Sequence, residues 1–174
     1  MNADFFEDAA MELFGETWKS KLPAAIGRDE STLRRQGYRN AISGPVQAAV
    51  VAWLILRREF WVLPPSFPEA PFTSIMTGIE VPLEDEMIAD VSIAGLRLFG
   101  ENWKTPMARA LGVERTSLWR MVSANAASAP IWAAIRAWML LYRFSGLRPP
   151  FDYTDLPSSA LNTGVRRGAS AAME

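Results

Sequence analysis

The sequence contains no cysteine and no histidine. The absence of cysteine excludes disulfides and thiolate nucleophiles, and the absence of histidine excludes imidazole acid–base chemistry. Without either residue type the common zinc sites are excluded as well. Lysine and carboxylate chemistry stay open, but the chain has neither a nucleophile paired with a base nor a glycine-rich phosphate loop. We therefore expect a protein that is not an enzyme and that holds no cofactor and no metal ion.

The chain also lacks a basic leader and a long apolar run. Asp4, Glu7 and Asp8 stand where a signal peptide carries Lys or Arg. The longest apolar run, residues 48–56, is far too short to span a bilayer. Of the 174 residues, 49% are hydrophobic and 21% charged, which is typical of a soluble globular protein. We expect a cytoplasmic protein without membrane contact.

A tandem repeat determines how the chain is organised. Residues 9–65 align with residues 94–150 at a constant offset of 85 without a gap, and 23 of the 57 aligned positions are identical. The clearest match is Leu-Phe-Gly-Glu-x-Trp-Lys, which begins at Leu13 and again at Leu98. Such self-similarity indicates a duplication, and each unit is large enough for one small helical domain.

Apolar residues within each unit recur at helical spacing. The first predicted helix contains Phe6 and Phe14 and ends at Gly15, or at Gly100 in the second unit. Three more helices are predicted in each unit: a short second one N-capped by Ser20 or Thr105 and ending at Gly27 or Gly112, a third from Asp29 or Glu114 to about Gly37 or Val122, and a fourth from Pro45 or Pro130 to about Phe60 or Phe144. Neither unit contains an alternating strand pattern, so the predicted fold class is all-α.

The second and third predicted helices of the later unit, within residues 105–122, carry a specific spacing. Two helices that cross steeply over a short turn need a small residue at their contact and a glycine in the turn. The pattern has a small residue, a glycine four positions later and three apolar positions: Ala108, Gly112, Val113, Leu118 and Met121. It resembles the helix-turn-helix of phage repressors and Cro proteins. The resemblance covers about 55 residues in each unit and implies two tandem four-helix helix-turn-helix domains.

The first unit departs from this pattern at two positions. Gly27 and Leu33 are in place, but Pro23 stands where the small residue belongs and Arg28 replaces the apolar residue after the turn. Pro23 falls within the first turn of its predicted helix, where proline is tolerated. Because Arg28 is charged where the pattern has an apolar residue, the geometry of the first unit's turn, or the use of this unit as a DNA reader, stays open.

The resemblance implies that the outer face of each third helix enters a major groove. Arg115 suits bidentate pairing with guanine, Thr116 a thymine methyl or a phosphate, and Lys104 with Thr105 a phosphate. Each Arg has the alternative interpretation of a solvated surface charge, and Trp119 is either an outward contact or a core residue. The implied DNA-binding residues are Lys104, Thr105, Arg115, Thr116, Ser117, Trp119 and Arg120 in the second unit and Lys19, Ser20, Ser31, Arg34, Arg35 and Tyr38 in the first.

These assignments divide the chain into four segments. The two helix-turn-helix domains are residues 1–61 and 87–150, and a Pro-rich linker, residues 62–86, joins them. Residues 62–90 contain six acidic residues and no basic one. We interpret the linker as a soluble connector, with competition against DNA for the basic face or contact with a partner as alternatives. Residues 151–174 are predicted to be a largely disordered tail.

Charge differs between the units. Residues 1–61 contain eight basic and eight acidic residues, whereas residues 91–146 contain seven basic and two acidic ones. Because phosphate neutralisation dominates DNA affinity, the second unit is the better candidate reader despite the net charge of −1. Asp29 and Glu30 at the tip of the first unit repel phosphate, so this unit either reads cytosine amino groups or contacts protein.

The sequence thus predicts a transcriptional regulator that binds double-stranded DNA sequence-specifically through two non-identical reading helices. The alternative is a protein-binding adaptor or anti-activator that keeps the helix-turn-helix fold without DNA contact. The fourth helices are rich in aromatic residues and offer a surface for inter-unit packing, a protein partner or self-association: Trp53, Phe60, Trp61, Trp132 and Trp138.

Overall fold

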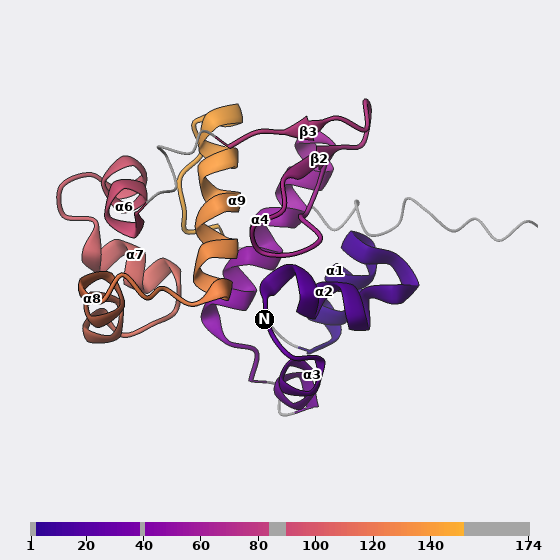
Figure 1. The fold of residues 1–174 in the computed structure, drawn as a ribbon, viewed down its shortest axis with the longest axis horizontal. Coiled ribbons are helices and arrows are strands. Elements are labelled where there is room, and N and C mark those ends of the chain that lie inside the picture. Colours follow the sequence, from indigo (N-terminus) through magenta and orange to yellow (C-terminus); the bar gives the residue numbers. More distant parts are fainter. Residues whose placement is uncertain (1–2, 39–40, 84–89, 152–174) are drawn as a thin grey trace, which may run out of the picture.

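The computed structural model describes residues 3–38, 41–83 and 90–151, which are mainly helical as predicted (Figure 1). The first repeat contains α1 (Ala3–Phe14), the 3₁₀ turn η1 (Gly15–Thr17), α2 (Trp18–Ile26), α3 (Glu30–Tyr38) and α4 (Gly44–Phe60). The second repeat contains α6 (Val91–Phe99), α7 (Lys104–Ala110), α8 (Arg115–Ser123) and α9 (Ala129–Ser145). Among the described residues, no helix combines the length and the apolar content that crossing a membrane requires.

Local sequence signals set most helix ends. Gly15 and Gly100 have φ angles of 69° and 76° directly after α1 and α6, a conformation that glycine adopts without steric cost. Ser43 and Ser128 occupy the N-cap positions of α4 and α9, and each of these helices has a proline in its first turn. The fourth helices therefore lie close to their predicted ranges. The third helices, α3 and α8, also lie close to theirs.

The predicted N-caps of the second helices are wrong. α2 begins at Trp18 and α7 at Lys104, so Ser20 and Thr105 lie inside the first turn of their helices rather than before it. The Ser20 hydroxyl donates a hydrogen bond to the Thr17 carbonyl at 3.1 Å. The physical reason is that a tight turn leads the chain directly into each helix, and no side-chain hydrogen bond caps either start.

Each repeat has an aromatic pair at the same place in its core. Phe14 meets Trp53 edge-on at 6.0 Å between ring centroids, and Phe99 meets Trp138 in the same way at 6.1 Å. Both tryptophans are almost completely buried. Because the two pairs are 85 residues apart in sequence, the duplication seen in the sequence is also present in the packing.

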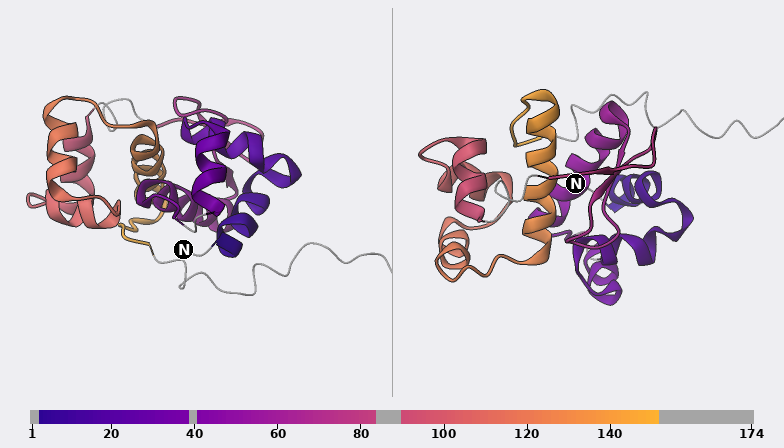
Figure 2. Two further views of the ribbon diagram at one scale, coloured as in Figure 1. Left: turned by 90° about the horizontal axis from the view of Figure 1, so that it is seen from below. Right: turned by 45° about the horizontal axis from the view of Figure 1, so that its top comes forward.

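The fourth helices of the two repeats pack against each other. α4 and α9 form the most extensive contact between described helices and lie side by side at the centre of the molecule (Figures 1 and 2). Residues 49–56 and 137–141 are buried throughout. A helix that is apolar on all sides needs such burial. The sequence left three roles open for these helices: inter-unit packing, a protein partner or self-association. The structure shows inter-unit packing.

The segment between the repeats contains a small antiparallel sheet that the sequence patterns did not predict. Strands β1 (Val62–Leu63), β2 (Phe72–Ser74) and β3 (Glu80–Val81) pair in this order. Val62 and Phe72 are buried in the common core. Strands of two or three residues are too short to show an alternating pattern in a sequence, which is why pattern analysis missed them.

Arg136 of α9 attaches this segment to the helices. Its guanidinium donates hydrogen bonds to the carbonyls of Pro68 and Ala70. Only 9% of Arg136 is exposed, and this burial lowers its pKa, while the nearby charge of Glu69 raises it. The equivalent residue of the first repeat is Val51, so a charged residue replaces an apolar one at the position that the inter-repeat segment covers.

Some predictions lie outside the described residues. These are the end of the predicted linker and the first residues of the second predicted domain, at residues 84–89, and nearly all of the predicted tail, at residues 152–174. The side chain of Tyr38, a predicted DNA-contacting residue, is also outside them.

Candidate nucleic-acid interface

The second and third helices of each repeat are joined by the same kind of turn. Gly112 follows the end of α7 with a φ of 63°, and the Val113 amide donates to the Ala108 carbonyl at 2.9 Å. In the first repeat Gly27 has a φ of 69°. A hydrogen bond of the same length joins the equivalent positions there. The positive φ explains why both turns contain glycine.

Pro23 and Arg28 do not change this turn. Pro23 lies inside α2, beyond its first turn, which corrects the prediction that placed it near the helix start. Pro23 is buried, and its carbonyl accepts the Arg28 amide at 2.9 Å. Arg28 is exposed, whereas Val113 at the equivalent position is half-buried. The first repeat therefore keeps the backbone of the turn and exposes a charged side chain there.

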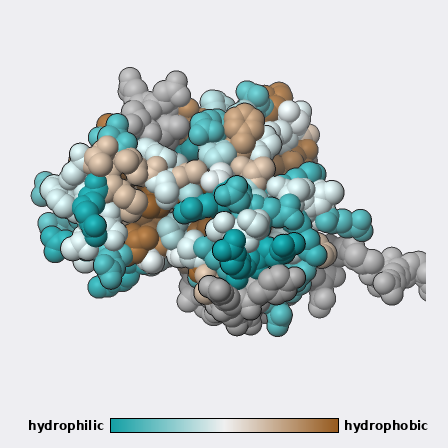
Figure 3. Space-filling view, turned by 60° about the horizontal axis from the view of Figure 1, so that its bottom comes forward, coloured by the Kyte–Doolittle hydropathy of each residue, from teal (hydrophilic) through white to brown (hydrophobic). Residues whose placement is uncertain are grey.

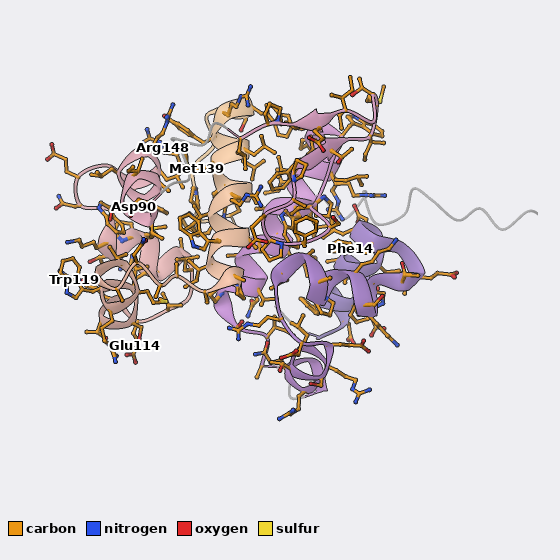
Figure 4. The ribbon with its side chains drawn as sticks, in the orientation of Figure 1. Phe14, Asp90, Glu114, Trp119, Met139 and Arg148 are labelled. Carbon is orange, nitrogen blue, oxygen red and sulfur yellow. The ribbon has the colours of Figure 1, made fainter. Side chains whose placement is uncertain are left out.

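One face of α8 is open to solvent. Leu118 is buried and attaches the helix to the core. Four residues at helical spacing are exposed on the other side: Arg115, Thr116, Trp119 and Arg120. Trp119 is 51% exposed and points away from the rest of the molecule (Figure 4). Of its two alternative positions, Trp119 has the outward one, and Ser117 lies half-buried at the edge of this face.

The equivalent face of α3 is open as well. Leu33 is buried in the place of Leu118. The exposed residues of α3 occupy the same four repeat positions: Glu30, Ser31, Arg34 and Arg35. The two helices therefore present matching positions with different side chains, because a glutamate and an arginine in α3 stand where α8 has Arg115 and Trp119.

A lysine from α7 extends this face of α8. The Lys104 ammonium lies 3.9 Å from the centroid of the Trp119 ring, a cation–π contact. Trp103, the neighbouring residue, is buried against α6. The stacking places an ammonium group next to the side chains of α8. Sequence analysis selected Lys104 and Trp119 separately, but only the packing of α7 on α8 brings them together.

The remaining predicted residues are less well placed. Lys19 is exposed, and its ammonium lies 5.7 Å from the ring of Trp18 rather than over a residue of α3, since α3 has no tryptophan at the position of Trp119. The Ser20 hydroxyl is already bonded within its own turn. Thr105 is exposed in the first turn of α7.

Among the described residues, no ion pair joins a carboxylate to the basic residues of these faces. Within residues 3–37, 41–83 and 90–151, the one ion pair joins Arg58 of α4 to Glu12 of α1, with 2.7 Å between Nη2 and Oε2. Arg115 and Arg120 are therefore free to bind an external anion or base.

The sequence analysis missed a reciprocal contact between the repeats. A Cβ atom added to Gly44 would lie 2.3 Å from the Leu111 carbonyl oxygen and 2.8 Å from the Gly112 Cα. A Cβ atom added to Gly27 would lie 2.6 Å from the Cβ of Ala129. Residues 27 and 112 are equivalent in the repeat, and so are 44 and 129. The turn of each unit therefore touches the start of the other unit's fourth helix, and the small residues at both starts were the available signal.

Chemically, these elements form two exposed helix faces that can donate hydrogen bonds to anions and to base edges. Comparison with protein-family models gives no match, and comparison with curated proteins and with solved structures gives no significant match.

Proposed function

We propose that the protein is a sequence-specific regulator that binds double-stranded DNA through two helix-turn-helix units. The observation that carries the proposal is the face of α8, where Arg115, Thr116 and Arg120 are exposed without a carboxylate partner among the described residues. A short helix that is attached to the core by a buried apolar residue and has a cationic outer face fits a major groove.

Each side chain of this face has a defined role. Arg115 pairs with a guanine edge through its planar guanidinium, and Thr116 contacts a thymine methyl group or a phosphate. Lys104, positioned by Trp119, neutralises a phosphate and fixes the register of the helix on the duplex. Binding is therefore expected to weaken as the salt concentration rises.

The two units read different sequences. Asp29 precedes α3 and Glu30 begins it, and both carboxylates are exposed at the end of the helix that faces the groove. A carboxylate repels phosphate but accepts a hydrogen bond from the cytosine amino group. The second unit supplies most of the affinity, and the complete site is asymmetric.

The proposal is tested by selecting bound duplexes from random DNA and measuring gel shifts on the selected site. The double variant Arg115→Ala/Arg120→Ala should lower affinity about 30-fold or more, since each well-placed arginine contributes roughly 1–3 kcal/mol of discrimination. Arg34→Ala/Arg35→Ala should lower it less.

Arg97→Ala is the matched control. Arg97 is also exposed in the second repeat, but it belongs to α6, which α7 separates from α8 (Figure 1). Its affinity should stay within about twofold of the parent, as expected for a surface charge outside the interface. Unchanged affinity of the Arg115/Arg120 variant, with its helical content intact, would contradict the proposal.

The second candidate function is a protein-binding adaptor. Large apolar side chains are exposed around the β2–β3 turn, where Trp61, Ile75 and Met76 are 55%, 39% and 74% exposed. Such residues are typical of protein-binding surfaces. If the selection from random DNA retains no duplex while the protein is folded, the adaptor becomes the better interpretation.

A further inference from the structure

The reciprocal contact between the repeats lies at the base of both candidate reading helices. α8 begins three residues after Gly112, and α3 begins three residues after Gly27. Each of these glycines packs on the start of the other repeat's fourth helix, at Gly44 and Ala129 respectively. In both contacts the turn of one repeat packs on the fourth helix of the other. The two repeats are therefore related by an approximate two-fold axis, as the subunits of a symmetric dimer are.

The same relation places both helices at one end of the molecule. α3 and α8 lie at the lower end in Figure 1, and the right-hand view of Figure 2 agrees. With this end turned toward the viewer, hydrophilic side chains cover one area over each repeat, and a strip between them includes hydrophobic side chains (Figure 3). One duplex lying across this end would meet both helices.

Buried packing contacts connect the two repeats that carry these helices. The buried contact of α4 with α9 joins the two repeats. The close approach at Gly44 leaves no room for the turn before α8 to move toward α4. Packed interiors resist such displacement, since an added methyl group already forces side chains or backbone to shift.

We propose that the contacts of Gly44 with Gly112 and of Gly27 with Ala129 fix the separation and the rotational phase of α3 and α8. The protein then recognises a bipartite duplex with a single allowed spacing between its two half-sites. This inference rests on the proposed function, which it makes specific. It differs from two readers on a flexible tether, which would accept several spacings.

Spacing variants of the selected site test the inference. Half-sites on a duplex return to the same face after about 10 base pairs. A flexible tether tolerates insertion of a full turn, whereas a rigid pair of readers tolerates neither a half turn nor a full turn. We expect insertions of about 5 and about 10 base pairs to reduce affinity alike, to that of a single half-site, a loss of roughly 100-fold or more.

Gly44→Ala provides a second measurement. The added methyl group would displace the turn before α8, because the nearest atom is a backbone oxygen. Affinity for the full site should fall at least tenfold. Affinity for a duplex that contains only the half-site read by α8 should be unchanged. Ser43→Ala is the control, since Ser43 neighbours Gly44 at the start of α4 but its side chain makes no capping hydrogen bond, and full-site affinity should be kept.

The outcomes separate this inference from the proposed function. Binding that survives the full-turn insertion, or a selected motif with one half only, overturns the fixed spacing but leaves DNA binding by α8 in place. Gel shifts that are insensitive to Arg115→Ala/Arg120→Ala contradict the proposed function itself. Loss of affinity with both insertions supports the inference even where Gly44→Ala does not fold.

Discussion

Tryptophan residues of the second repeat occupy two contrasting environments. Trp138 is 1% exposed and packs edge-on against Phe99, so it fills the core. Trp119 is half exposed on α8 and contacts the Lys104 ammonium through the face of its ring. The same side chain therefore stabilises the fold at one position and arranges a surface charge at the other.

This contrast predicts different stabilities for two alanine variants. Trp138→Ala should lower the free energy of unfolding by roughly 3–5 kcal/mol, because it leaves a large cavity. Trp119→Ala should lower it by about 1 kcal/mol or less, the contribution of a surface cation–π contact. Denaturant unfolding followed by far-UV circular dichroism measures both values, and equal losses would contradict the assignment of Trp119 to the surface.

At the scale of elements, α9 differs from α4 by one buried charge. Arg136 replaces the apolar residue of the first repeat and donates to backbone carbonyls of the segment that leads to β2. A buried guanidinium is costly to desolvate, and these carbonyl acceptors offset the cost. The inter-repeat segment is therefore attached to the helices rather than a free connector.

Substitution of Arg136 tests this attachment. Arg136→Met should lower the free energy of unfolding by about 2 kcal/mol, because the buried Ala70 carbonyl and the partly buried Pro68 carbonyl lose a charged donor. Protease cleavage near residues 66–71 should become faster. Arg143→Met is the matched control: Arg143 also donates to a carbonyl of this segment, that of Pro82 at 2.7 Å, but it is exposed. Its loss should be under about 1 kcal/mol, and equal effects of the two variants would argue against the role of burial.

At the scale of the whole molecule, the two repeats share one hydrophobic core. Buried residues of α1 and α4 belong to the same cluster as those of α6 and α9. The short helices α7 and α8 are far below the length at which isolated helices are stable, so they depend on this core. The repeats are therefore expected to unfold together.

Calorimetry checks this expectation. A single transition should appear, with equal calorimetric and van't Hoff enthalpies. Trp53→Ala in the first repeat should lower the melting temperature of the whole transition by about 10 °C, from a cavity cost of a few kcal/mol. Two resolved transitions, with only one shifted by the substitution, would show that the units unfold independently.

Much of the fold follows from local signals. The helices that begin after Ser43 and Ser128 were predictable because serine, proline and apolar spacing act within one or two turns. The exposed positions of α8 were predictable because the helical period puts Leu118 on the opposite face. Neither the strands nor the partner of Arg136 was predictable, since strands of two or three residues and a charge within an apolar run are stabilised by contacts with distant segments.

The duplication, the helices of each repeat and the glycine turns follow from the amino-acid order alone, because identity at a fixed offset, helical periodicity and a positive φ do not depend on contacts between distant residues. Three features needed the folded chain: the packing of α4 on α9, the stacking of Lys104 on Trp119 and the contact of the turns at Gly27 and Gly112 with the opposite repeat. The Lys104–Trp119 contact depends on how α7 packs on α8, and the contacts between the repeats form because each repeat buries apolar surface that the other leaves exposed.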